Sequence, residues 1–212
     1  MQSRRWIFHL AAFSIVFCGM AGWGADGLQV KILSTVINND LKPEVTFTAQ
    51  DDVGNPIALA DMTVRFMIAR LDVYDAQKGS AAYWSYNTRV QTVPEGYPNA
   101  GAQADQGTFD SNGTLTPLEP GKYRYTFKTA LPADYDKTKT HTVGGQIQRN
   151  VGDKTFYANP LYHFVPNGSD VVALRKVVTT EACNKCHTAL GFHGGGRREV
   201  GLCILCHNPQ ST

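Results

Sequence analysis

Apolar and polar residues alternate in short runs through most of the chain, from residue 28 to about residue 170. An alternation with a period of two is typical of β-strands that bury one face. The clearest runs are residues 30–32, 45–49, 64–68 and 123–128. Segments rich in Gly, Pro, Asn and Asp, which favour turns, lie between them at 51–56, 118–121 and 150–153. The pattern predicts a mainly β fold, an antiparallel Greek-key sandwich or small split barrel.

Residues 69–113 interrupt this pattern, with only a weak strand signal around 82–90. We expect a long excursion over the barrel, in which Trp84 and Tyr86 close one end of the β core. A binding face made of the same aromatic residues is the alternative. Because the β region has no phosphate loop, nucleophile elbow or telling carboxylate pair, its sequence indicates no chemistry of its own.

The first 25 residues have the features of a secretory signal peptide. Arg4 and Arg5 precede an apolar run that extends to Ala21, and small residues follow. The Arg pair also fits a twin-arginine signal, and Cys18 leaves a lipoprotein anchor as an alternative. No later stretch of the sequence is long and apolar enough to span a bilayer.

The net charge of +2 conceals two regions of opposite sign. Residues 26–174 hold 13 basic and 16 acidic residues, a net charge of −3, whereas residues 175–212 hold five basic and two acidic residues, a net charge of +3. With 42% hydrophobic residues, the composition excludes a disordered chain, and neither region is basic enough to indicate a nucleic-acid partner. The basic tail suits an anionic group held close by.

The C-terminal tail contains the chemistry. It carries two C-x-x-C-H motifs, formed by Cys183, Cys186 and His187 and by Cys203, Cys206 and His207. This is the pattern of c-type haem attachment. Two thiols at this spacing add to the two vinyl groups of the porphyrin, and the adjacent His reaches the iron from one face. The sequence therefore predicts haem c as the cofactor, bound at two motifs.

Two other interpretations fit the cysteines alone. The spacing is also that of a four-cysteine zinc site, and an exported chain could form disulfides. The histidines favour haem, because with 6 His in 212 residues both motifs would end in His by chance only about once in a thousand. Since haem is attached after export to an unfolded chain, we interpret the Arg pair as a general secretory signal.

Each iron needs a second axial ligand, and no Met lies in the tail. The remaining candidates are histidines, so we predict low-potential haems with two His ligands each. His193 follows His187 by six residues, a reach of about 20 Å, which favours ligation of a neighbouring haem. His163 is a weaker candidate and His141 weaker still, and a surface or strand-end His without a ligand role is the alternative for each.

Other residues of the tail suit a haem environment. Three glycines at 194–196 would let the backbone approach a macrocycle, and the Arg197-Arg198 pair could bind propionates. Apolar residues of the tail would cover the ring: Leu190, Phe192, Leu202, Ile204 and Leu205.

The tail, from Glu181 to Arg197 and from Cys203 to Pro209, closely resembles the first haem segment of the outer-membrane decahaem cytochromes of the OmcA/MtrC type. Residues 28–170 look like that family's N-terminal β-barrel domain. The resemblance implies a multihaem electron-transfer protein of the cell surface, outer membrane or periplasm. Its expected partners are other multihaem cytochromes or an outer-membrane electron conduit, and extracellular acceptors such as metal oxides.

Carried over by position, the resemblance makes the four tail cysteines haem attachment points, His187 and His207 proximal ligands, and His193 a distal ligand. We expect a signal peptide at 1–25, a β domain at 26–174, and the start of a multihaem domain at 175–212, with a short, mostly irregular or helical haem-binding segment. About 38 residues cannot enclose two haems, so we expect a truncated product or haems that pack against another subunit.

We expect this chain to be an electron-transfer protein rather than a conventional enzyme, with terminal metal reduction as an activity it could carry. The alternative function is an exported β-sandwich interaction module whose tail holds a structural metal on four cysteines.

Overall fold

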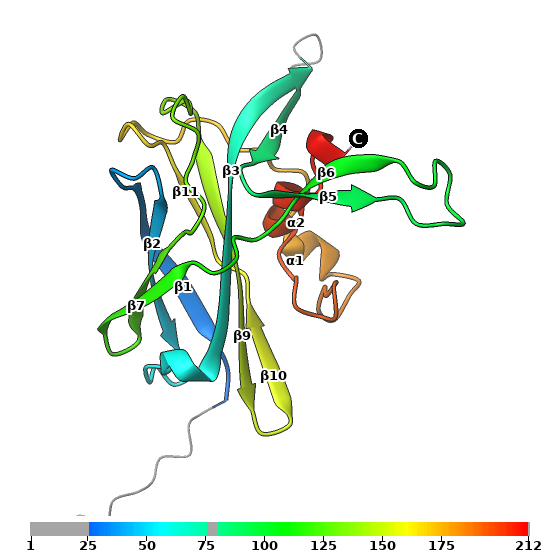
Figure 1. The fold of residues 1–212 in the computed structure, drawn as a ribbon. Coiled ribbons are helices and arrows are strands. Elements are labelled where there is room, and N and C mark those ends of the chain that lie inside the picture. Colours follow the sequence, from blue (N-terminus) through cyan, green and yellow to red (C-terminus); the bar gives the residue numbers. More distant parts are fainter. Residues whose placement is uncertain (1–25, 76–79, 212) are drawn as a thin grey trace, which may run out of the picture.

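A computed structural model describes residues 26–75 and 80–211 of the chain (Figure 1). The predicted signal peptide, with Arg4, Arg5 and Cys18, lies outside the described residues. Within the described part, no helix is long and apolar enough to cross a membrane.

The first sheet has four antiparallel strands in the order β1-β2-β8-β7. Its strands are β1 (Gln29–Ile37), β2 (Pro43–Gln50), β8 (Lys122–Thr126) and β7 (Thr114–Glu119). Buried and partly exposed residues alternate along β2 and β8, as the period of two predicts. The buried face of this sheet therefore points to the core between the two sheets.

The second sheet has the order β10-β9-β3-β4, and β11 also pairs with β9. Its strands are β3 (Met62–Asp75), β4 (Ser80–Ser85), β9 (His141–Val151), β10 (Lys154–Ala158) and β11 (Leu161–Phe164). In the middle of β3, four consecutive residues from Phe66 to Ala69 are completely buried. Such a run requires cover on both faces of the strand. The first sheet covers one face and the C-terminal tail covers the other.

The core between the sheets is rich in aromatic residues. The Phe66 ring lies 5.3 Å from the ring of Phe47 and 5.4 Å from that of Tyr125, measured between centroids. Phe47 and Tyr125 come from the first sheet and Phe66 from the second, so these rings join the layers. The prediction of a mainly antiparallel β sandwich is confirmed, and the described strands do not close into a barrel.

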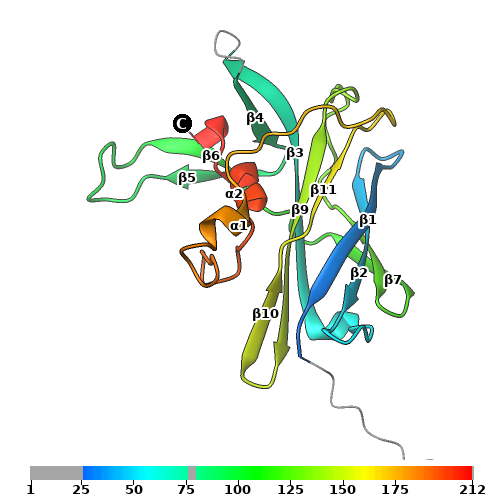
Figure 2. The same ribbon diagram turned by 180° about the vertical axis from the view of Figure 1, so that it is seen from behind.

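The predicted interruption at residue 69 is wrong. β3 continues to Asp75 and pairs with β4, and the apolar run at its centre hides the alternation because both of its faces are buried. The excursion itself is a hairpin of β5 (Thr88–Thr92) and β6 (Gln103–Gly107), which projects from the sandwich beside the C-terminal end of the chain (Figures 1 and 2). A short 3-10 helix, η1 (Leu59–Asp61), precedes β3.

The tail forms α1 (Thr180–Cys183), α2 (Val200–Cys206) and the 3-10 helix η2 (Pro209–Ser211). Leu202 and Leu205 of α2 are buried against Met67 and Tyr83 of the second sheet. A Cβ on Gly144 of β9 would lie 2.7 Å from the Cδ1 of Leu202 and 2.8 Å from that of Leu205. The absence of a side chain on β9 therefore lets α2 pack directly on the sheet.

Candidate haem-attachment sites

The second C-x-x-C-H motif lies on α2 and at its C-terminal end. The Glu199 side chain caps the helix by accepting from the backbone N–H of Gly201 at 3.0 Å. The helix ends at Cys206, and the His207 N–H donates to the Cys203 carbonyl at 2.9 Å. One helical segment thus carries both thiols and the adjacent imidazole, the local conformation that haem attachment requires.

The two thiols of this motif differ in exposure. Cys206 is 5% exposed, and its sulfur lies 3.4 Å from the Met67 sulfur, whereas Cys203 is only partly buried and His207 is exposed. Burial raises the pKa of both thiols above the usual value for cysteine. Cys206 therefore lies in an apolar environment, which suits a thioether more than a thiolate.

The loop from Phe192 to Arg197 closes on itself. The two residues form an antiparallel bridge, with backbone bonds of 2.9 Å and 3.2 Å. His193, Gly194 and Gly195 have φ angles of 51°, 75° and 85°. Three left-handed residues in succession explain two of the three glycines. Asn159 fixes the loop to the sandwich, since its side chain donates to the Gly196 carbonyl at 3.1 Å.

This loop places His193 opposite His207. The centroids of the two imidazole rings lie 6.4 Å apart, with an angle of 32° between the ring planes. Imidazole nitrogens bind transition metals at about 2 Å. Two such bonds, together with the distance from each coordinating nitrogen to the centroid of its ring, give a centroid separation of about 6 Å. The separation therefore fits one iron between the two histidines.

An open cavity of about 370 Å³ surrounds this pair. Its walls are mainly apolar, and both thiols of the motif line it: Phe192, His193, Arg197, Leu202, Cys203, Cys206 and His207. Burial, and then the charges of Arg197, His207 and Arg89, lower the pKa of His193. Its imidazole is therefore kept neutral, the form that binds a metal. The residues present fit a covalently attached haem.

The first motif follows the same local plan in a more exposed place. The Thr179 hydroxyl caps α1 by accepting from the Ala182 N–H at 3.2 Å, and the His187 N–H donates to the Cys183 carbonyl at 3.1 Å. Cys186 and His187 are exposed. Within the described ranges, the structure records no ring contact that pairs His187 with another histidine.

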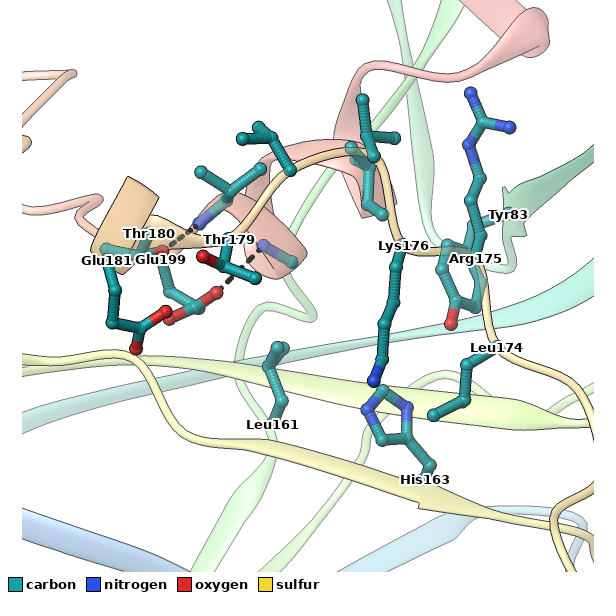
Figure 3. A pocket seen from close by; sticks show the side chains of 15 residues that line it. Tyr83, Leu161, His163, Leu174, Arg175, Lys176, Thr179, Thr180, Glu181 and Glu199 are labelled. Carbon is teal, nitrogen blue, oxygen red and sulfur yellow. Dashed lines mark hydrogen bonds between the residues drawn. The ribbon is translucent and has the colours of Figure 1, made fainter. Parts of the chain in front are cut away.

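His163 lies elsewhere, at the wall of a cavity of about 210 Å³ between β11 and the segment that leads to α1 (Figure 3). Its Nδ1 is 2.8 Å from the Thr142 hydroxyl, and Lys176 points toward its ring. Burial and the Lys176 charge lower its pKa. The described lining contains no cysteine and no second histidine. The structure therefore does not bring His163 into a cluster with either motif.

His141 is completely buried and has both ring nitrogens occupied. Its Nδ1–H donates to the Lys139 carbonyl at 2.9 Å, and its Nε2 accepts from the Tyr86 hydroxyl at 2.8 Å. Burial lowers its pKa, so the ring is neutral in the fold. His141 is a structural residue of the core.

The alternative of a four-cysteine metal site finds no geometric support. Within the described ranges, no group of three or more His, Cys, Asp or Glu residues is arranged to hold a metal ion. Sequence reasoning missed Arg65 and Arg89, which line a second cavity beside His193 and Cys206. No motif marks either residue, because the fold alone brings them to the tail.

A β sandwich that carries two C-x-x-C-H motifs is the combination expected of a c-type cytochrome module. The family described as "Outer membrane cytochrome MtrC/MtrF-like, domains II/IV" matches residues 175–212. The multiheme cytochrome MtrC of Shewanella baltica (strain OS185) is 27% identical over 184 residues, which cover 82% of this chain and 26% of that protein.

Two solved structures share the fold. The outer-membrane decaheme cytochrome OmcA matches with a TM-score of 0.70 at 22% identity, over 91% of this chain and 30% of OmcA. MtrC from Shewanella baltica OS185 matches with a TM-score of 0.64 at 23% identity, over 87% of this chain and 30% of MtrC. The chain therefore spans less than a third of the length of these relatives.

Together these matches confirm the resemblance that the tail motifs predict. The chain is similar to a portion of the OmcA/MtrC-type decahaem cytochromes, in sequence to MtrC and in fold to both OmcA and MtrC. They also support export and a location at the cell surface or outer membrane.

Proposed function

We propose that this chain is an electron-transfer module that binds haem c at two motifs and acts in extracellular electron transfer. The observation that carries the proposal is the approach of His193 to His207, with ring centroids 6.4 Å apart, beside the two thiols of the second motif. The haem iron supplies the one-electron chemistry when bound.

In the second site, Cys203 and Cys206 would hold the macrocycle, and His207 and His193 would be its proximal and distal ligands. The left-handed loop at 193–195 aims the His193 imidazole, and Asn159 prevents the loop from moving away from the sheet. Leu202 and Phe192 contribute apolar surface to the cavity walls. Two imidazole ligands keep the reduction potential low, as electron transfer to weak oxidants requires.

In the first site, Cys183 and Cys186 would hold the second haem, and His187 would be its proximal ligand. Its distal ligand stays open, and His163 remains a candidate from the sequence. We assign residues 26–174 to the β domain and 175–212 to the haem segment. The expected partners are other multihaem cytochromes or an outer-membrane conduit, with extracellular acceptors as the electron sink. The support for these partners is that OmcA is described as an outer-membrane decaheme cytochrome and MtrC as a multiheme cytochrome.

The first experiment tests haem attachment itself. The full chain is expressed with a cytochrome c maturation system and stained for haem after denaturing electrophoresis. We expect covalent haem on the wild type, its loss from each motif when both cysteines of that motif are replaced by Ala, and no haem on the variant that lacks all four. A wild-type chain without covalent haem would overturn the proposal and favour the structural-metal alternative.

A second experiment tests the ligand assignment. In a Cys183→Ala/Cys186→Ala background only the second motif retains haem, so its spectrum can be read alone. His193→Ala should convert a low-spin spectrum to a high-spin one, whereas His163→Ala should leave it low-spin. An unchanged low-spin spectrum in the His193 variant would refute the distal role of His193.

A further inference from the structure

A second cavity, of about 520 Å³, adjoins the candidate haem site and is strongly cationic. Arg65 from β3, Arg89 from β5 and Arg197 from the tail loop line it. The cavity also reaches His193 and Cys206, which it shares with the space around the histidine pair. Residues separated by more than a hundred positions in sequence thus meet around one space.

Among the described residues of this lining, Asp110 is the only acidic one, and its carboxylate already accepts hydrogen bonds. It is 4% exposed and accepts from the Tyr125 hydroxyl at 2.9 Å, the Lys128 N–H at 2.9 Å and the Thr129 N–H at 3.2 Å. Within the described ranges, none of the three arginines forms an ion pair with a carboxylate. The cavity therefore has guanidinium charge to offer an anion.

The arginines differ in how firmly they are held. Arg197 lies over the Phe109 ring, 5.1 Å from its centroid, and its Nε is 3.2 Å from Gln146 Oε1. Its side chain helps fix the loop. Arg65 and Arg89 are exposed, and Arg89 makes only a long contact of 3.4 Å with Gln106. These two guanidinium groups can turn toward a ligand without breaking a buried interaction.

The β5–β6 hairpin is fixed beside the second motif. A Cβ on Gly107, at the end of β6, would lie 3.0 Å from the Leu205 carbonyl and 3.1 Å from the Cys206 Cα. The Gln210 side chain of η2 accepts from the Ser85 N–H at 2.7 Å and donates to the Ser85 carbonyl at 3.1 Å. The hairpin therefore carries Arg89 at a defined place relative to Cys206.

We propose that Arg65 and Arg89 bind the propionate carboxylates of the haem attached through Cys203 and Cys206. This inference rests on the proposed function. Haem carries two carboxylates, and the planar fork of arginine matches a carboxylate with two parallel hydrogen bonds. The β domain then supplies part of the haem site, and the hairpin acts as a clamp on the macrocycle edge.

The proposal has an electrostatic consequence. Reduction removes one positive charge from the haem, so nearby cations stabilise the reduced state. Arginines that neutralise the propionates therefore raise the reduction potential. Replacing one of them by a neutral residue leaves a propionate charge uncompensated and shifts the equilibrium toward the oxidised haem.

The test uses the full chain in the Cys183→Ala/Cys186→Ala background, loaded with haem by a maturation system, so that one haem is titrated. Arg89→Gln and Arg65→Gln are compared with Arg124→Gln, which changes a partly exposed arginine on β8 whose Nε lies 3.8 Å from a Glu44 carboxylate oxygen. The readouts are the covalent haem content and the midpoint potential from spectroelectrochemical titration. Arg89→Lys keeps the positive charge but removes the planar guanidinium group that can form two parallel hydrogen bonds.

We expect every variant to retain covalent haem, because attachment depends on the cysteines. Arg89→Gln and Arg65→Gln should each shift the one-electron equilibrium about three- to tenfold toward the oxidised state, a tenfold shift being about 59 mV. Arg89→Lys should shift it less, and Arg124→Gln should not shift it measurably. Potentials of the Arg89 and Arg65 variants equal to that of the Arg124 variant would overturn the inference while haem attachment stands. A wild type without covalent haem would instead refute the proposed function.

Discussion

Leu205→Ala should release α2 from the sandwich without weakening the core between the sheets. Leu205 is completely buried against Met67 and Tyr83, and it does not belong to the core between the two sheets. Truncating a fully buried Leu costs about 2–5 kcal/mol. If α2 opens locally, the population of the open form rises by about 30-fold to a few thousand-fold, since about 1.4 kcal/mol corresponds to a factor of ten.

The Cys206 thiol reports this opening. It is 5% exposed in the closed form, so a thiol reagent reaches it only when α2 leaves the sheet. The assay uses the chain expressed without haem, with Cys183, Cys186 and Cys203 replaced by Ser, and follows the labelling rate of Cys206 by mass spectrometry. Leu205→Ala should accelerate labelling by the factor given above.

Leu131→Ala is the matched control, because Leu131 is 4% exposed and belongs to the core between the sheets. It should lower the denaturant midpoint of the whole chain but leave Cys206 labelling in water nearly unchanged. Equal acceleration in both variants would show that α2 opens only with global unfolding. An unchanged rate in Leu205→Ala would refute the packing of α2 on the sheet.

Three further outcomes follow from single residues. Desolvation lowers the pKa of buried His141, so the unfolded chain binds a proton more readily and stability should fall as the pH drops below about 6.5. In urea unfolding measured at several pH values, His141→Phe should flatten that fall, and an identical slope would contradict the reasoning. Asp110→Ala leaves the Tyr125 hydroxyl and two backbone N–H groups without their acceptor. It should lower the free energy of unfolding, measured by chemical denaturation, by about 2–4 kcal/mol, whereas Asp40→Ala at an exposed position should lower it by less than about 0.5 kcal/mol. Gly194→Ala, at φ 75°, should lower the free energy of unfolding by about 1–2 kcal/mol and perturb the low-spin haem spectrum. Gly191→Ala, where φ is not positive, should leave the spectrum unchanged. Identical spectra of the two variants would argue against an orienting role for the loop.

The sequence predicts the sandwich well where strands bury one face only. β2 and β8 alternate in burial as their residues alternate in polarity. The prediction recognised residues 64–68 as a strand but ended it at residue 69, although β3 continues to Asp75 and pairs with β4. Phe66 to Ala69 are buried on both faces, so the alternation disappears there. The hidden partner is α2, more than a hundred residues away, and a local pattern carries no information about it.

The same long-range packing explains what the sequence could and could not predict about the site. The C-x-x-C-H spacing predicts the six attachment and proximal residues, because the chemistry it indicates is local. Leu202 and Leu205 were expected as cover for the macrocycle, yet both pack on the sheet, and only Leu202 also lines the cavity. Their spacing of three places them on one face of α2, and the sheet occupies that face.

The two motifs differ in their environment although they share a local plan. α2 is packed on the sheet, with Cys206 buried and His193 opposite His207, whereas Cys186 and His187 of the first motif are exposed. The second site therefore draws on four separate segments of the chain: β3, the β5–β6 hairpin, the loop at 192–197 and α2. Because burial and nearby cations both favour the reduced haem, we expect the haem proposed at the second motif to have the higher potential of the two. An electron entering at the first motif would then pass downhill toward the β domain.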